Sequence, residues 1–161
     1  MYSLPKWKDP GRKRKLHISY KDPDFCRHYD LDLDDFTDLV TKLHSGQRLT
    51  PAQDERYASY LYTIIFITME NPKFRTKPAD EKFELFDKAI YELVMAMPGF
   101  NPQRGSSIYS YAYRCCYVAF CHYYTDKNKE LEKQLAIEEH CREELKFFYD
   151  EFIDFHKTEK H

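Results

Sequence analysis

Hydrophobic residues recur at every third or fourth position over most of this chain, which is the spacing of one face of an α-helix. The first such segment begins at Leu31 and ends at Gly46, a residue type that often terminates helices. A second begins after Thr50, which is followed by Pro51 and Gln53 in the arrangement of a helix cap. The pattern therefore predicts two successive helices.

Two further helical patterns flank a break that is rich in proline and glycine. One begins at a capping Asp80 and stops at Pro98. The other follows the turn 101–105 and runs to about Tyr124, with a serine as its cap. No segment shows the strict alternation of a strand convincingly, so the sequence predicts an all-α fold.

A last apolar stripe lies near the C-terminus and predicts an amphipathic helix from Lys127 to about His156. Acidic residues occupy the other side of this helix. The stripe either completes the protein's own core or binds an apolar, basic-rimmed groove on a partner. Its members are Leu145, Phe148, Tyr149, Phe152 and Ile153.

The pattern divides the chain into three parts. Residues 1–30 lack helical periodicity and predict a mostly irregular arm, whose basic run at 12–15 suits phosphate contacts but more often marks a solvated tail. Residues 31–125 form the helical core, and residues 126–161 form the acidic amphipathic helix. With 161 residues, of which 17% are aromatic, the chain can bury one core.

Charge and cysteine content restrict the function classes. A net charge of −2 is unusual for a protein that binds nucleic acid alone, because such binding depends on many phosphate contacts. The five cysteines lack framework spacing, which is typical of reduced thiols. Since no apolar segment suits a membrane span or a signal peptide, we expect a cytoplasmic protein without membrane contacts.

The residue types that support catalysis lack the required spacing. Cysteines and histidines form neither a CxxC nor an HExxH pair, and a di-iron site would need glutamate at position 137, where Ile137 stands before His140. The four glycines form no phosphate cradle. The sequence favours a protein that is not an enzyme and that uses neither metal nor cofactor.

The helix after the turn 101–105 is unusually rich in tyrosine. Five aromatic side chains fall within about 80° of one another around its axis. Such rings can stack on unpaired bases, but a stripe of this kind more often packs against a neighbouring helix. We interpret it as packing. The five are Tyr109, Tyr113, Tyr117, Phe120 and Tyr124.

The stretch FNPQRGSSIYSYAYR resembles the part of bacterial RNA polymerase sigma factors that binds and melts the promoter −10 element. That family has approximately Phe-Asp-Pro-x-x-Gly, two variable residues and Phe-Ser-Thr-Tyr-Ala. Upstream, ELFDKAIYELVMAM lies without gaps where the family has a helix that binds the polymerase clamp. The resemblance covers about residues 50–129. The matches are Phe100, Pro102, Arg104, Gly105, Tyr111, Ala112, Tyr113 and Arg114.

The resemblance implies a sigma region-two-like helical bundle and two binding surfaces. The surface for the polymerase clamp comprises Glu84, Asp87, Lys88, Tyr91 and Glu92. The surface for promoter DNA comprises Arg104, Tyr111, Arg114, Val118, Cys121, Lys127 and Lys129. Tyr111 would stack on a base flipped from the −10 element, and Phe100 would be core. The sequence departs from the family at Lys88, which replaces an acid, and at Arg114 and Cys115, which replace two tryptophans.

The chain is most similar to the short late-gene sigma factors of tailed phages, because nothing after Thr125 suggests a −35-binding domain. Those proteins end in an acidic, apolar segment that binds the polymerase flap, and they depend on a sliding clamp and a co-activator. The flap-binding residues would be Leu145, Phe148, Phe152 and Phe155. Two alternatives stay open: a polymerase-binding regulator that blocks or displaces the host sigma factor without reading DNA, and a structural helical adaptor.

Overall fold

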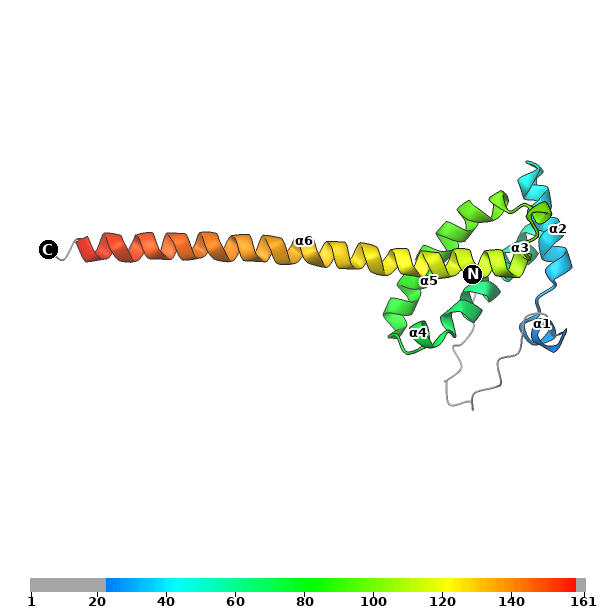
Figure 1. The fold of residues 1–161 in the computed structure, drawn as a ribbon, viewed down its shortest axis with the longest axis horizontal. Helices are drawn as coiled ribbons and strands as arrows, with labels where there is room; N and C mark the ends of the chain where they lie inside the picture. Colours follow the sequence, from blue (N-terminus) through cyan, green and yellow to red (C-terminus); the bar gives the residue numbers. More distant parts are fainter. Residues whose placement is uncertain (1–22, 159–161) are drawn as a thin grey trace.

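The computed structural model describes residues 23–158, and all regular structure in this range is helical (Figure 1). The all-α prediction is therefore confirmed, while the basic run at 12–15 lies outside the described residues. The main helices are α1 (Pro23–Tyr29), α2 (Leu33–His44), α3 (Pro51–Met69), α4 (Pro72–Arg75), α5 (Ala79–Ala96) and α6 (Ile108–Thr158). Two short 3-10 helices, η1 (Met97–Gly99) and η2 (Pro102–Arg104), connect α5 to α6.

The N-terminal part of α6 packs against α5 and α3, and α2 packs against α3 and η1 (Figure 1). These contacts bury a core to which every helix from α2 to α6 contributes. Burial of large apolar side chains is the main stabilising term in such a bundle. The largest fully buried side chains include Phe36, Leu61, Phe74, Leu85, Leu93, Met97 and Phe120.

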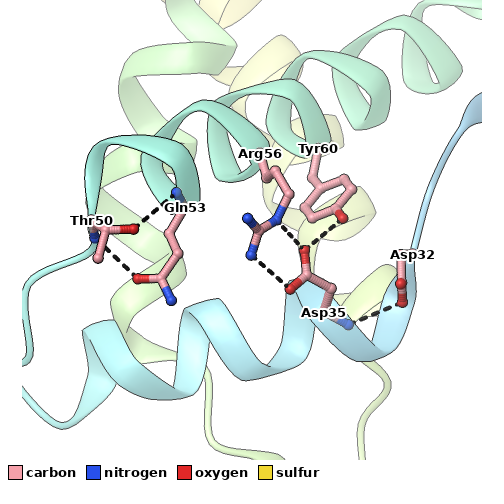
Figure 2. Close-up of polar contacts among 6 residues, drawn as sticks. All are labelled: Asp32, Asp35, Thr50, Gln53, Arg56 and Tyr60. Carbon is pink, nitrogen blue, oxygen red and sulfur yellow. Dashed lines mark hydrogen bonds and ion pairs between the residues drawn. The ribbon is translucent and has the colours of Figure 1, made fainter.

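The starts of α2 and α3 have the side-chain caps that short helices need. The Asp32 carboxylate accepts a hydrogen bond of 3.0 Å from the backbone N–H of Asp35. Thr50 and Gln53 form a reciprocal capping box, with N···O distances of 3.0 and 3.3 Å (Figure 2). The cap predicted at Thr50 is therefore confirmed.

A group of hydrogen bonds joins α2 to α3. The Asp35 carboxylate accepts hydrogen bonds from Arg56 at 2.9 and 3.2 Å and from the Tyr60 hydroxyl at 2.7 Å (Figure 2). The hydrogen bonds from Arg56 and Tyr60 hold the pKa of Asp35 below its ordinary value. Charge-assisted bonds of this kind fix the relative orientation of the two helices.

The structure corrects the prediction for the end of the arm. Residues 23–29 form α1 rather than irregular chain, and Phe25 and Tyr29 pack against the core. The Tyr29 hydroxyl donates a hydrogen bond of 2.7 Å to Glu70. A helix of seven residues is too short to give a periodic signal, so tertiary contacts decide its structure.

The structure also corrects the elements further along the chain. The expected break between two helices near residues 125–127 is absent, because α6 is continuous from Ile108 to Thr158. No glycine or proline follows Gly105 to interrupt it. Asp80 lies in the first turn of α5 rather than at its cap, and α4 was not expected.

The C-terminal part of α6 extends away from the bundle (Figure 1). The interpretation that its apolar stripe completes the protein's own core is wrong, since Leu145, Phe148 and Phe152 are 60–70% exposed. No helix among residues 23–158 combines the length and the apolar character needed to cross a membrane.

Candidate functional site

The turn between α5 and α6 has a well-defined conformation. The Asn101 side chain accepts a hydrogen bond of 3.0 Å from the backbone N–H of Gln103, which shapes η2. Gly105 follows with a φ of 79°, in the left-handed region that residues with a Cβ rarely adopt. Phe100, expected to be core, is only 2% exposed. The turn therefore presents the exposed Arg104 at a fixed place before α6.

Tyr111 connects the beginning of α6 to the end of α5. Its hydroxyl donates a hydrogen bond of 2.9 Å to the carbonyl oxygen of Ala96, and its ring centroid lies 5.2 Å from that of Phe100. The side chain is half-buried, and desolvation raises the pKa of Tyr111 above its ordinary value. The ring is thus held in one orientation while part of it stays accessible.

The predicted DNA-contacting residues on α6 occupy one side of that helix beyond Tyr111. Arg114, Val118 and Cys121 follow one another at spacings of four and three residues, so they form a row along the helix surface. Arg114 is exposed, Val118 is 39% exposed and Cys121 is half-buried. The structure thus gives these residues a common, partly accessible face.

The two lysines predicted to contact phosphates have different environments. Lys127 Nζ lies 3.8 Å from the Glu81 carboxylate and 5.6 Å from the ring centroid of Tyr123. Lys127 is therefore partly engaged by α5. Lys129 is exposed on α6.

The aromatic stripe of α6 packs into the protein, as interpreted. Tyr109 and Phe120 are buried, and Tyr113, Tyr117 and Tyr124 are partly buried against the core. Phe74 of α4 inserts among these rings, which gives the stripe its own partner within the bundle.

Three of the predicted clamp-binding residues make polar contacts with α6. Lys88 Nζ lies 3.3 Å from the Glu92 carboxylate and 3.4 Å from that of Asp126. The hydrogen bond to Glu92 raises the pKa of Lys88 above its ordinary value. Glu84 accepts a hydrogen bond from the Tyr123 hydroxyl, and the Glu92 carboxylate lies 3.2 Å from His122 Nδ1. These contacts help to join α5 to α6. Lys88 thus forms its ion pairs with carboxylates of this chain.

The other two predicted residues, Asp87 and Tyr91, point outward from α5 in an apolar surrounding. Tyr91 is 67% exposed, and its helical neighbours Val94 and Met95 are 49% and 68% exposed. Sequence reasoning missed Val94 and Met95 as surface residues. The sequence did contain a signal for them, since Val94 and Met95 follow Tyr91 by three and four residues. Residues at these spacings share one face of a helix.

A surface cavity of about 320 Å³ lies between the outer face of α5 and the row on α6. It brings together Tyr91, from the predicted polymerase surface, and Val118, from the predicted DNA surface. The two surfaces that the resemblance implies are thus adjacent in space. The other lining residues are Glu92, Met95, Ala96 and Cys115.

The predicted flap-binding residues lie apart from this site, on the extended part of α6. Leu145, Phe148 and Phe152 are exposed there, and Phe155 lies on the same helix. Among residues 23–158, no three histidine, cysteine, aspartate or glutamate side chains come together in a way that could hold a metal ion.

Comparisons with known proteins give no match to this chain, whether against protein-family models, curated proteins or solved structures.

Proposed function

We propose that this protein is a sigma-like transcription initiation factor that binds core RNA polymerase and captures the melted strand of a −10-like promoter element. The observation that supports this best is the adjacency of two accessible faces. The outer face of α5, with Tyr91, meets the row on α6, with Val118, at one cavity. A factor that holds DNA against polymerase needs these two surfaces side by side.

The outer face of α5 has the chemistry of a protein-binding surface. Tyr91, Val94 and Met95 are exposed apolar side chains on adjacent turns, and such clusters mark interaction sites when they are contiguous. Asp87 adds one exposed carboxylate, which provides charge specificity for a basic partner surface. The clamp helices of bacterial RNA polymerase are the partner that the sequence resemblance implies.

The start of α6 provides the features that strand capture requires. Arg104 and Arg114 are exposed cations on either side of Tyr111. A base stacked on an aromatic ring contributes about 1–3 kcal/mol, which offsets the cost of unstacking it. Because the chain has a net charge of −2, polymerase supplies most of the binding energy.

The extended part of α6 has a role in the same proposal. Leu145, Phe148 and Phe152 form an apolar stripe with acidic neighbours, which suits an apolar groove with a basic rim. The polymerase flap is the partner that the resemblance to late-gene factors of tailed phages implies. A sliding clamp or a co-activator would then complete the initiation complex.

Charge reversal on α5 tests polymerase binding. Asp87→Lys should weaken the retention of this chain on immobilised core polymerase. Asp38→Lys, which makes the same charge change at an exposed position of α2, should not. Equal retention of wild type and Asp87→Lys would contradict the assigned surface.

A second candidate function is a regulator that binds polymerase and blocks or displaces the host sigma factor without reading DNA. The hydrogen bond from Tyr111 to Ala96 favours it, because that bond gives the Tyr111 hydroxyl a structural role within the molecule. Permanganate footprinting of the polymerase complex separates the two functions. Reactive thymines at a defined promoter require strand opening, and their absence with intact polymerase binding would favour the regulator.

A further inference from the structure

Three cations occur within five residues on the short segment between α3 and α5. Lys73 and Arg75 belong to α4, and Lys77 follows in the next turn. Between them, Phe74 is completely buried, with its ring centroid 4.8 Å from that of Phe120. Because Phe74 anchors this segment to α6, the backbone that carries the three cations is held beside that helix. We call Lys73, Arg75 and Lys77 the basic cluster.

Aromatic rings lie beside the two lysines of the basic cluster. Lys73 Nζ lies 5.4 Å from the ring centroid of Tyr117 and donates a hydrogen bond of 3.4 Å to its hydroxyl. Lys77 Nζ lies 5.0 Å from the ring centroid of Tyr124. A ring orients an ammonium group without neutralising its charge.

Carboxylates do not compensate the basic cluster within the part of the chain that the structure describes. Neither lysine nor Arg75 takes part in any ion pair among residues 23–158. This contrasts with Lys88 and Lys127, which pair with carboxylates of the opposing helix. In a chain with a net charge of −2, the basic cluster therefore offers cations that no carboxylate of the described residues pairs with.

A surface cavity lies where Lys73 and Lys77 approach α6. Its volume is about 330 Å³, and it is lined by Lys73 and Lys77 on one side and by Cys121 and Thr125 of α6 on the other. Tyr124 completes the lining. The space admits a phosphate group with several water molecules, since one water occupies about 30 Å³ in the liquid.

We propose that the basic cluster binds backbone phosphates of double-stranded DNA that lies next to the captured strand. This inference rests on the proposed function, because Cys121 belongs both to this cavity and to the row of predicted DNA contacts on α6. A duplex that follows the row would bring its backbone over Lys73 and Lys77. Lysine contacts phosphate as a point charge, so these contacts contribute affinity and register without base specificity.

The salt dependence of DNA binding tests this assignment. The full chain is titrated into fluorescently labelled double-stranded DNA at several salt concentrations, starting from low salt. Removing two phosphate contacts in the double variant Lys73→Gln/Lys77→Gln should reduce the slope of log affinity against log salt by about 1.8, at about 0.9 for each contact. The double variant Lys73→Arg/Lys77→Arg should keep the wild-type slope.

A matched control makes the same change in net charge elsewhere. Lys133→Gln/Lys146→Gln alters two exposed positions on the extended part of α6 and should leave the slope unchanged. Circular dichroism of each variant verifies its fold. An unchanged slope in the Lys73/Lys77 glutamine variant would overturn the inference, as would an equal change in the control or no binding by the wild type. An equal loss on single-stranded DNA or a larger one on double-stranded RNA would overturn the assignment to a DNA duplex.

The outcome is separable from that of the proposed function. If the chain binds polymerase and opens a promoter but shows no slope change, only the phosphate assignment fails. If it shows the lysine-dependent slope but neither binds polymerase nor opens a promoter, the proposed function fails and the phosphate site stands.

Discussion

Tyr111 offers the sharpest test, because its hydroxyl and its ring have separable roles. The hydroxyl makes an internal hydrogen bond of 2.9 Å to Ala96, whereas the half-buried ring is the proposed stacking surface. Tyr111→Phe removes only the hydroxyl. Tyr111→Ala removes both the hydroxyl and the ring.

The two substitutions should have different effects on stability and on strand capture. Loss of the hydrogen bond costs about 0.5–1.5 kcal/mol of unfolding free energy in either variant. Tyr111→Ala should cost about 2–3 kcal/mol in total, because it also removes a half-buried ring. Strand capture should be unchanged in Tyr111→Phe, since its ring can still stack. It should fall about 5- to 150-fold in Tyr111→Ala, which corresponds to about 1–3 kcal/mol.

Two measurements separate these effects. Urea denaturation of the isolated chain gives the loss of stability, and permanganate reactivity of promoter thymines with core polymerase gives the extent of strand opening. Retention on immobilised polymerase serves as the control and should be equal for wild type and both variants. If Tyr111→Phe lost strand opening as severely as Tyr111→Ala, the ring would not be a stacking surface and the residue would act by holding α5 to α6.

Three further predictions concern the stability of the fold. Phe74→Ala should lower the unfolding free energy by about 3–5 kcal/mol, because the side chain is completely buried; urea denaturation measures this, and a loss below about 1 kcal/mol would contradict the packing of α4. Asp35 has a lowered pKa in the folded protein, so its contribution to stability is complete above the ordinary aspartate pKa of about 4 and is lost as pH falls through the lowered pKa. The urea midpoint of Asp35→Asn should therefore fall less steeply in acid than that of wild type, and parallel curves would refute the role of the α2–α3 contacts. Truncation after Lys129 should change the stability of the bundle by less than about 0.5 kcal/mol, because residues 130–152 are all exposed; a loss as large as that of Phe74→Ala would contradict the extended position of the helix.

Local sequence signals were reliable at some helix ends but not at others, since the cap at Thr50 is confirmed whereas Asp80 lies in the first turn of α5. The capping box at Thr50 and Gln53 could be predicted from the sequence because its hydrogen bonds join residues three positions apart. The end of α5 just before Pro98 was predictable because proline cannot continue a helix. Periodicity gave the buried faces of α2 and α3 for a similar reason, since a helix repeats its faces every three to four residues. On α5 it did not separate the buried Leu85 from the exposed Phe83.

The candidate site was only partly predictable. The resemblance identified Asp87, Tyr91 and Tyr111, which are accessible or partly accessible in the structure. It could not distinguish them from Glu84 and Lys88, whose side chains contact α6. Those contacts join residues about forty positions apart, so no local pattern reveals them.

The amino-acid sequence by itself determined the all-α class, the main helices of the bundle and the predicted residues of both surfaces. Only the tertiary structure decided that Phe25 and Tyr29 of α1 pack on the core and that Lys73 and Lys77 line one cavity with Cys121. The physical reason is the range of the interactions. Backbone hydrogen bonds and apolar periodicity act between near neighbours, whereas burial and charge compensation depend on segments that meet only when the chain folds.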